Sequence, residues 1–418
     1  MPKDHQTGVQ RCAASVERAR APKLETGRGG VNFRTRGRRP FAPSCLAVTV
    51  LVVLAGCASK PNPAPVDAGI YWPTYLGNYA RTPFLNQRIT SEPPNIVWEM
   101  YVGPALRGMP VVTDEVIIAA ASDRRVHSLN PVDGSTFWRS RIDGPPNQLL
   151  VVGDVIYAGT EADGRLVALD AVLGKDTWKF KLPSIEKPIT LAGDTLFAAT
   201  EDGSLFAIEP GEEEPIWRAF FPRAASASPL VLDGWIVYVA YDSLYVLDRI
   251  DASRRAAAYS SEIFIGEAAS DGEVVYLATE LGSLTAWSLP DLEFIWQASG
   301  FGNFVSGPVL ADSVGYAVTR IGSLLKFDIK SGTTRIIADA SSTVLAPPTV
   351  VANGVLVGTL EGRLHFFSRD GEPIWDVELE GSIEEPVFVH KSRVIVPMYG
   401  KRRASLGSGS NGKIVLLR

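Results

Sequence analysis

Tryptophan recurs at a nearly constant spacing along the last three quarters of the chain. Six of these residues are separated by 40, 40, 39, 79 and 79 positions, and each double gap leaves room for one missing member, near Ala257 and near Ile336. A period close to 40 residues is typical of the four-stranded blades of β-propellers. The spacing therefore predicts a ring of eight repeats. The six tryptophans are Trp98, Trp138, Trp178, Trp217, Trp296 and Trp375.

Each repeat has the turn chemistry of four short antiparallel strands. In the second repeat, an apolar segment over residues 149–160 is followed by an Asp-Gly hairpin, a third strand, a turn at Gly174 and a last strand that carries Trp178. Glycine suits such hairpins because it adopts a positive φ without a Cβ clash. The hairpin glycines are spaced by 39, 79, 40 and 40 residues, the same period as the tryptophans. They are Gly164, Gly203, Gly282, Gly322 and Gly362.

The two ends of the repeat array predict how the ring closes. The last repeat, residues 385–417, contains three strands but no tryptophan strand, whereas the first tryptophan strand, residues 95–100, has no three strands before it. Pairing these incomplete units removes the open sheet edges that would otherwise favour aggregation. The sequence thus predicts an all-β fold, an eight-bladed β-propeller of four-stranded antiparallel blades whose last blade is closed by the N-terminal strand.

The first 56 residues have a different composition. A basic stretch is followed by an apolar run over residues 45–55, which is too short to span a bilayer and is typical of a secretory signal. The run ends in Leu-Ala-Gly before Cys57 and looks like a bacterial lipobox, which predicts cleavage at that point and a lipid such as palmitate on the thiol. Ala58 in the next position indicates sorting to the outer membrane. An ordinary signal with an incidental Cys57 is the alternative, and a start site beyond the first 30 residues stays open.

A short tether and one domain are predicted after the signal region. Residues 57–70 comprise Cys57 and a proline-rich spacer, and residues 71–418 form the propeller. The other two cysteines, Cys12 and Cys45, precede the cleavage site, so the mature chain has no pair for a disulfide. It keeps 31 basic and 43 acidic residues, a net charge of −12. Nucleic acid is therefore not an expected partner, because phosphate binding needs a basic surface.

Catalytic and metal-binding patterns are sparse. The three histidines of the mature chain, His127, His365 and His390, are far apart and form no zinc motif. His127 and His365 occupy third-strand positions, where packed or half-exposed histidines are expected. The acidic runs 212–214 and 384–385 fall in predicted turns and indicate solvated loops. We therefore predict no catalytic residue, no cofactor-binding residue and no metal ligand.

Residues 407–412 match the dinucleotide pattern G-x-G-x-x-G by letter only. That pattern works when a helix follows and directs its N-terminal amides at the pyrophosphate, but here residues 413–417 form an apolar strand. The segment is predicted to be a hairpin loop in the eighth blade, and the basic residues 401–403 precede it. A solvated loop and a partner contact both remain open for this hairpin.

The repeats resemble the PQQ-binding-like, quinoprotein-type repeat family. The family pattern of Ala-Leu-Asp, Gly and Trp is present as residues 168–170, Gly174 and Trp178, and residues 72–82 look like the lead-in of that family. The resemblance covers about residues 70–418 and is more specific for fold than for function. Within the family, a lipid-anchored eight-bladed propeller of this size is similar to the outer-membrane assembly lipoproteins of the BamB type.

The resemblance implies a non-catalytic scaffold, a monomer within a complex, that the lipid anchor holds on the periplasmic face of the outer membrane. Its implied partners are the β-barrel assembly protein and unfolded outer-membrane proteins. Docking in that family uses an arginine and apolar residues before blade four and acids before blade five. This chain lacks the matching aspartate pair, and ordinary loop packing is the alternative for every position. The corresponding residues are Phe220, Phe221, Arg223, Glu262 and Glu267.

Two other functions stay open. Quinoprotein dehydrogenases of the same repeat family hold their quinone on a vicinal cysteine disulfide and bind calcium, and the mature chain has no cysteine pair. The tryptophans are interpreted as wedges between blades that bury apolar area, not as a cofactor platform. A periplasmic PQQ-dependent oxidoreductase is therefore the second hypothesis, and a propeller that binds an envelope glycan or another envelope protein is the third.

Overall fold

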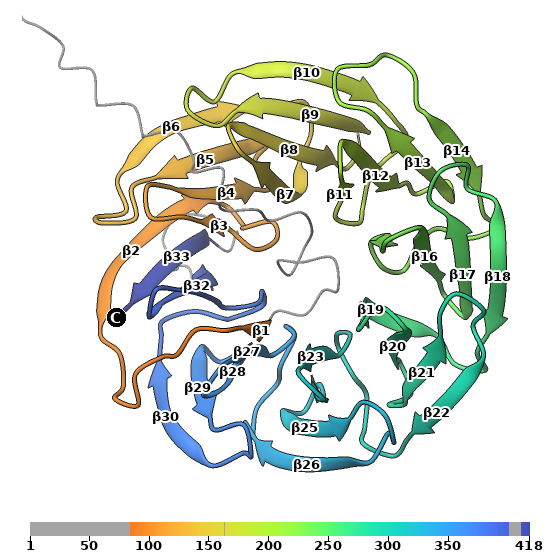
Figure 1. The fold of residues 1–418 in the computed structure, drawn as a ribbon. Coiled ribbons are helices and arrows are strands. Elements are labelled where there is room, and N and C mark those ends of the chain that lie inside the picture. Colours follow the sequence, from red (N-terminus) through yellow and green to blue (C-terminus); the bar gives the residue numbers. More distant parts are fainter. Residues whose placement is uncertain (1–83, 163, 401–410) are drawn as a thin grey trace, which may run out of the picture. The chain divides into compact units, whose positions relative to one another are not determined.

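The computed structural model describes residues 84–162, 164–400 and 411–418, and this part of the chain consists of strands, turns and loops. The strands form eight sheets arranged as blades around an axis, and each blade has four antiparallel strands that we call A to D from the axis outward (Figure 1). The predicted all-β, eight-bladed propeller is confirmed. The described residues include no helix that is long and apolar enough to span a membrane.

The strands follow the chain from blade to blade. Blade 1 contains β3 (Val111–Val112), β4 (Ile117–Ala121), β5 (Arg125–Leu129) and β6 (Thr136–Arg141), and blade 2 contains β7 (Pro146–Val152), β8 (Val155–Thr160), β9 (Arg165–Asp170) and β10 (Asp176–Lys181). Blade 3 contains β11 (Thr190–Ala192), β12 (Thr195–Ala199), β13 (Ser204–Ile208) and β14 (Trp217–Phe220), and blade 4 contains β15 (Leu230–Val231), β16 (Trp235–Ala240), β17 (Ser243–Asp248) and β18 (Arg254–Tyr259).

The second half of the ring repeats the plan. Blade 5 contains β19 (Phe264–Ser270), β20 (Val274–Thr279), β21 (Leu284–Ser288) and β22 (Phe294–Ala298), and blade 6 contains β23 (Val309–Ala311), β24 (Val314–Val318), β25 (Ser323–Asp328) and β26 (Thr334–Asp339). Blade 7 contains β27 (Thr349–Val351), β28 (Gly354–Gly358), β29 (Arg363–Phe367) and β30 (Pro373–Glu378). Blade 8 contains β31 (Phe388–His390), β32 (Arg393–Gly400), β33 (Asn411–Leu417) and, as strand D, β2 (Ile96–Gly103).

Burial along the strands explains the sequence pattern. Strands B and C lie between neighbouring blades and are buried on both faces, as in β4 and β13, where every residue is buried. Such strands are continuous apolar runs. The outermost strands have one face in solvent, so β18 alternates between exposed and half-buried residues. Alternation with period two is expected for a strand with one solvated face.

The hairpin glycines occupy the conformation predicted for them. Gly203 has a φ of +82°, and a Cβ on it would lie 2.4 Å from the carbonyl oxygen of Phe221. Gly362 has a φ of +88°, and its Cβ would lie 2.2 Å from the carbonyl oxygen of Gly381. The B–C hairpin therefore needs glycine both for its backbone conformation and for the close approach of the next loop.

The N-terminal and C-terminal strands close the ring as predicted. Strand β2 pairs antiparallel with β33, and Asn95 and Arg418 exchange two backbone hydrogen bonds of 2.9 Å at the end of the pair. The ammonium of Lys413, which is buried, lies 2.9 Å from a carboxylate oxygen of Glu99 across the same two strands. Because the two partners come from opposite ends of the chain, this ion pair joins the ends of the fold.

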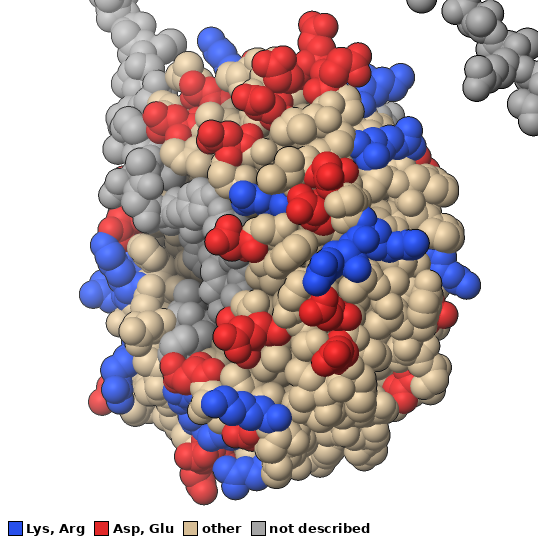
Figure 2. Space-filling model, turned by 45° about the vertical axis from the view of Figure 1, so that its right-hand side comes forward, with Lys and Arg blue, Asp and Glu red and all other residues tan. Residues whose placement is uncertain are grey.

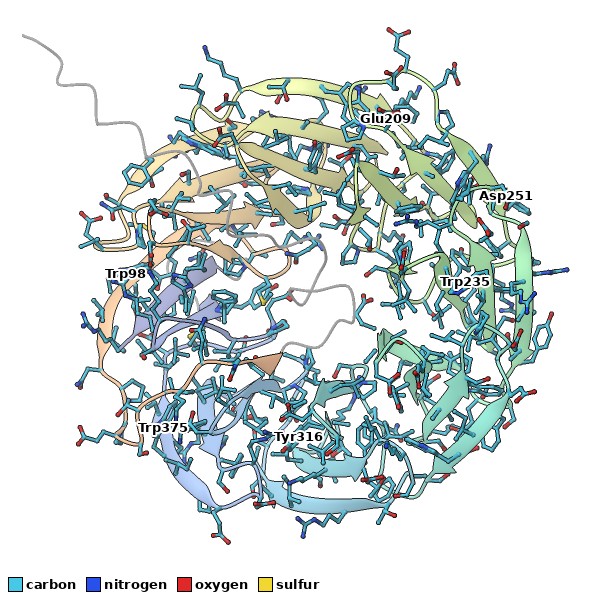
Figure 3. The ribbon with its side chains drawn as sticks, in the orientation of Figure 1. Trp98, Glu209, Trp235, Asp251, Tyr316 and Trp375 are labelled. Carbon is cyan, nitrogen blue, oxygen red and sulfur yellow. The ribbon has the colours of Figure 1, made fainter. Side chains whose placement is uncertain are left out.

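The six periodic tryptophans are wedges between blades, as predicted. Each indole Nε1 donates to a backbone carbonyl of the next blade's C–D turn or its equivalent, at 3.0 to 3.3 Å. Trp375 donates to Thr90, which precedes β2 and replaces the C–D turn that blade 8 cannot have. Trp98 and Trp375 can be followed beside the outer strands in Figure 3. The described core divides into eight apolar clusters, one between each pair of neighbouring blades.

The two blades without a tryptophan are stabilised in other ways. The pairing of strands C and D places the positions that lack a tryptophan at Ala256 and Arg335. Each lies one residue before the position predicted from the sequence. Trp287 of blade 5 packs with Ala256 in the cluster between blades 4 and 5. The buried Tyr316 of blade 6 (Figure 3) donates its hydroxyl to the carbonyl of Arg369 in the C–D turn of blade 7, at 3.1 Å. Ion pairs cross the same interfaces, between Arg255 and Asp291 at 2.9 Å and between Arg335 and Asp370 at 3.4 Å.

One strand outside the eight four-stranded blades was not expected from the repeats. The two-residue strand β1 (Phe84–Leu85) pairs in parallel with β27 on the axis side of blade 7 (Figure 1). We call residues 84–94 the strap, because they lead from this position to the start of β2. The signal region, Cys57, the tether and the predicted lead-in at residues 72–82 lie outside the described residues, as does the 401–410 hairpin.

Candidate functional site

The loops of the ring fall into two sets. The B–C hairpins and the D–A loops between successive blades lie at one end of the strands, and we call this side the hairpin face. The A–B and C–D turns lie at the other end, and we call that side the turn face. Loops on a rigid scaffold are where binding residues concentrate. All five residues predicted for docking lie on the hairpin face or just below it.

The loop before blade 4 presents two of its three predicted residues. Phe220 ends β14 and is 69% exposed, and the guanidinium of Arg223 lies 4.9 Å from the ring centre of the half-exposed Tyr241. Phe221 is instead buried and stacks on Tyr238 with 4.0 Å between ring centres. The Tyr238 hydroxyl donates to the carbonyl of Arg223 at 3.2 Å. Phe221 therefore anchors the loop from below, so it is not available to a partner in this structure.

The two predicted acids are turned away from this loop. Glu262 accepts hydrogen bonds from the Thr279 and Ser283 hydroxyls of its own blade, the latter at 2.9 Å. Glu267 accepts bonds from the backbone amide and the hydroxyl of Ser228 in blade 4, the latter at 2.8 Å. The first carboxylate stabilises a hairpin and the second joins two blades near the axis. The structure does not bring them together as an acidic pair.

Further apolar side chains on the hairpin face were missed at the level of sequence. The B–C hairpins of blades 4 to 7 each expose a large apolar residue beside a charged one, whereas the described hairpin residues of blades 1 to 3 include no exposed large apolar side chain. An apolar residue beside a turn glycine, as in Leu281-Gly282 and Ile321-Gly322, is the signal that could have found them. Exposed apolar groups that gather on one surface indicate an interaction site. The set on this face, apart from Phe220, is Tyr241, Tyr259, Ile263, Leu281, Ile321 and Leu360.

The exposed apolar residues of the turn face are arranged differently from those of the hairpin face. It exposes Val132, Leu173, Ile216 and Ile250, one in each C–D turn of blades 1 to 4, where the turns lie at the outer rim. Each of these four blades thus exposes one such residue in its C–D turn. Charged side chains of both signs are mixed over the side of the ring that carries blades 3 to 5, with uncharged areas between them (Figure 2).

A cavity of about 420 Å³ lies on the axis and opens among the D–A loops. Residues of all eight blades line it, including five carboxylates and two basic groups. Arg107 and Glu161 form an ion pair of 3.3 Å across its wall. Burial raises the pKa of Glu385 to about 7, partly opposed by a hydrogen bond from the Gly108 amide, and Glu384 raises it further. The charged lining residues are Arg107, Glu161, Glu186, Lys187, Glu267, Glu384 and Glu385.

The histidines do not form a site. Burial lowers the pKa of His127 and of His365, and the His365 ring stacks on Phe367 with 5.7 Å between centres. His390 contacts Asp114 at 2.9 Å, which joins blade 8 to blade 1. The described part of the chain has no group of three or more His, Cys, Asp or Glu side chains that could hold a metal ion. The prediction that His127 and His365 are packed or half-exposed on third strands is confirmed.

Comparison with known proteins identifies the repeat type. The profile of the family described as outer membrane protein assembly factor BamB matches residues 89–186 and 162–262. No curated protein sequence matches the chain. Solved structures share the fold at low identity.

Among the solved structures, BamB from Moraxella catarrhalis aligns with a TM-score of 0.63 and 16% identity over 78% of this chain and 99% of its own. Quinohemoprotein alcohol dehydrogenase from Comamonas testosteroni aligns with a TM-score of 0.66 and 13% identity, over 84% and 81%. A europium-containing methanol dehydrogenase gives 0.67 and 12%, over 83% and 98%. At these identities the structural matches establish the fold, which scaffolds and enzymes share.

Proposed function

We propose that this chain, a PQQ-type propeller that resembles the assembly factor BamB, is a non-catalytic scaffold of the outer membrane. Its hairpin face docks on the periplasmic part of a β-barrel assembly protein and assists the insertion of unfolded outer-membrane proteins. The observation that supports this most is the surface formed by Phe220, Arg223 and Tyr241 at the blade-4 loop, within the residues that the BamB family profile matches.

The chemistry of this surface suits protein recognition. Tryptophan, tyrosine and arginine are the residues most enriched among those that dominate the binding energy of protein interfaces. Arg223 stacks on Tyr241, which holds the guanidinium in place, and the loop backbone is fixed by the Tyr238 hydroxyl. Exposed Phe220 and Tyr259 extend the apolar area beside them. A pre-ordered loop of this kind binds with a smaller entropic cost.

The membrane anchor is part of the proposal. A lipid on Cys57 would hold the ring on the periplasmic side of the outer membrane. The 26 residues between Cys57 and Phe84 reach about 90 Å when fully extended.

The axial cavity gives less support to the second hypothesis, a quinone-dependent enzyme, than the hairpin face gives to the scaffold. Pyrroloquinoline quinone is a tricarboxylate, whereas the described residues that line the axial cavity include five carboxylates and two basic groups. The chain after Cys57 also has no cysteine for a vicinal disulfide. These residues do not fit the cofactor. Dye reduction after reconstitution with the quinone and calcium would revive the oxidoreductase hypothesis.

Affinity purification tests the proposal. The lipidated protein is isolated from detergent-solubilised membranes after crosslinking, and we expect recovery of the barrel-assembly subunit. Its absence under crosslinking, or the recovery of glycan or of an unrelated envelope protein alone, would contradict the scaffold function. Cys57→Ser should release the protein into the soluble fraction, and retention on the membrane would refute the anchor.

A further inference from the structure

A second cavity lies on the turn face, between blades 3, 4 and 5. Its volume is about 380 Å³, and it is formed by the A–B turns of the three blades and the C–D turn of blade 4. Ala192, Val231 and Leu232 give it an apolar lining. A Cβ placed on Gly193 or Gly272 would meet no atom within 4 Å, so the space beside these two turns is open. A cavity of this size and lining suits an apolar group.

Exposed apolar side chains lie in the turns around this cavity. Ile250 follows Arg249, which lines the cavity, and is 80% exposed. Ile216, in the C–D turn of the neighbouring blade 3, is 53% exposed. Apolar side chains that gather on one surface, bordered by polar residues, indicate an interaction site.

The charge of these turns is strongly one-sided. The turns of blades 3 to 5 on this face contain eleven acidic residues and a single basic residue, Arg249. Glu209 of blade 3 and Asp251 of blade 4 mark two of these turns in Figure 3. Like charges on one rigid surface produce a field that attracts cations. The turns are residues 193–194, 209–216, 232–234, 249–253, 271–273 and 289–293.

Three of the acids are not used within the ring. Asp194, Asp233 and Glu273 occupy the A–B turns of blades 3, 4 and 5, and all three are exposed. Their carboxylates have no hydrogen-bond or ion-pair partner among the described residues. Asp271 differs, because it accepts the Tyr276 hydroxyl at 2.9 Å. The three free carboxylates thus border the apolar cavity on successive blades.

The combination of charge and apolar lining restricts what this surface can bind. Nucleic acids and anionic lipid surfaces are repelled by it. The described part of the chain offers no group of three or more acids that could hold a metal ion. We propose that the turn face of blades 3 to 5 docks a basic segment of a partner protein. An apolar side chain of that segment enters the cavity, and flanking lysines or arginines contact Asp194, Asp233 and Glu273.

This surface is separate from the docking surface at the blade-4 loop. The A–B turns lie at the opposite end of the strands from Arg223, so both surfaces can be occupied at the same time. The ring then joins two proteins instead of binding one. The chemistry of the turn face does not depend on which protein the hairpin face binds.

Labelled peptides test the proposed chemistry. The probe is a fluorescein-labelled peptide with one leucine between two pairs of lysines, and its binding to the full mature chain in detergent is followed by fluorescence anisotropy. A peptide with glutamates in place of the lysines should bind at least about 10-fold more weakly, because the surface is acidic. A peptide with serine in place of the leucine should also bind about 10-fold more weakly, because it leaves the apolar cavity unfilled. Equal affinity of either control peptide would overturn the proposal.

Two triple variants locate the binding surface. The turn-face variant carries Asp194→Asn, Asp233→Asn and Glu273→Gln, and we expect it to bind the lysine peptide at least about 5-fold more weakly. The control variant carries Glu201→Gln, Glu280→Gln and Glu361→Gln, three exposed acids of the hairpin face, and should lose less than about 2-fold. An equal loss in both variants would show that net charge alone attracts the peptide and would refute the site.

Thermal unfolding provides a separate test of the three carboxylates. Since they have no partner within the ring, the turn-face variant should have the same Tm as the unchanged protein. A lowered Tm would show that the ring uses these acids for its own stability and would contradict their assignment to a partner. Failure of these experiments leaves docking through Arg223 unaffected, and a failed purification of the barrel-assembly subunit leaves the turn-face surface unaffected.

Discussion

The interfaces between blades and the hairpin face both concentrate aromatic residues, but they use them differently. Trp375 is 6% exposed and donates its Nε1 hydrogen to a neighbouring blade, whereas Phe220 is 69% exposed and Tyr241 is 45% exposed. The first set is spread over six of the eight blades, whereas the exposed hairpin residues Tyr241, Leu281, Ile321 and Leu360 recur at nearly the same spacing in blades 4 to 7 alone. Buried residues that recur around the ring thus describe the architecture, and exposed apolar residues confined to one arc of one face indicate where a partner can bind. Changes between blades should reduce stability, and changes on the face should reduce binding.

The largest effect is expected from a wedge. Trp375→Ala removes a buried indole and its hydrogen bond to Thr90, and the free energy of unfolding should fall by about 4 kcal/mol. Denaturant titration followed by fluorescence measures this. Phe294→Ala, at a 54% exposed position, is the control and should change stability by less than about 1 kcal/mol. A wedge variant as stable as this control would contradict the structural role of the tryptophans.

The second largest effect is expected from the ion pair between Lys413 and Glu99, which joins the two ends of the fold. Lys413→Ala leaves Glu99 beside a buried gap, and we expect a loss of about 3 kcal/mol in the free energy of unfolding, the lower end for a buried pair because Glu99 is 31% exposed. The double variant Lys413→Met with Glu99→Gln removes both charges and should recover most of the loss. If the single and the double variants are equally unstable, lost packing explains the effect and the pair does not.

Glu385 should make stability depend on pH. Its pKa is about 7 in the folded ring, above the ordinary value of 4.5, so between these pH values the folded state keeps a proton that the unfolded state has lost. Stability should therefore fall as the pH rises from 4.5 to 7. Glu385→Gln removes this loss and should be more stable by about 2–3 kcal/mol at pH 8, with no difference at pH 4. Parallel pH profiles for the two proteins would contradict the burial of this carboxyl.

A smaller effect is expected where a blade lacks its tryptophan. Tyr316→Phe keeps the ring but removes the hydroxyl that donates to Arg369, and the free energy of unfolding should fall by about 1 kcal/mol. Tyr259→Phe, at a 66% exposed position, serves as the control. Thermal unfolding of both variants would show whether Tyr316 substitutes for the missing indole bond, and identical Tm values would argue against it.

The sequence predicted most of the ring because its features are local and repeated. The tryptophan period, the turn glycines and the unfinished last repeat predict the blade count and the closure, since each depends on nearby residues in a fixed order. The compensation by Trp287 and Tyr316 was not predicted, because each lies on a different strand from the residue it replaces. The strand β1 was not predicted either, since two residues have no period and its partner strand is far along the chain.

The candidate site was predicted in part. Arg223 and Phe220 lie on the surface as a docking loop requires, and this role remains a prediction. Adjacent residues of an extended chain point to opposite sides, and Phe221 directly follows Phe220, the last residue of β14, so Phe221 is buried while Phe220 is exposed. The partners of Glu262 lie in the hairpin of its own blade, and sequence alone cannot show such a contact between separate strands.

The most direct measurement compares Arg223→Glu with Lys330→Glu, an equal change of charge in an exposed C–D turn on the turn face. Binding to the purified periplasmic part of the barrel-assembly protein is measured by calorimetry, and stability by denaturant titration. We predict that Arg223→Glu weakens binding at least about 10-fold while its free energy of unfolding changes by less than about 0.5 kcal/mol, and that Lys330→Glu changes neither. Equal binding by the two variants, or a loss of stability in Arg223→Glu large enough to explain its weaker binding, would contradict the assignment of function to the hairpin face.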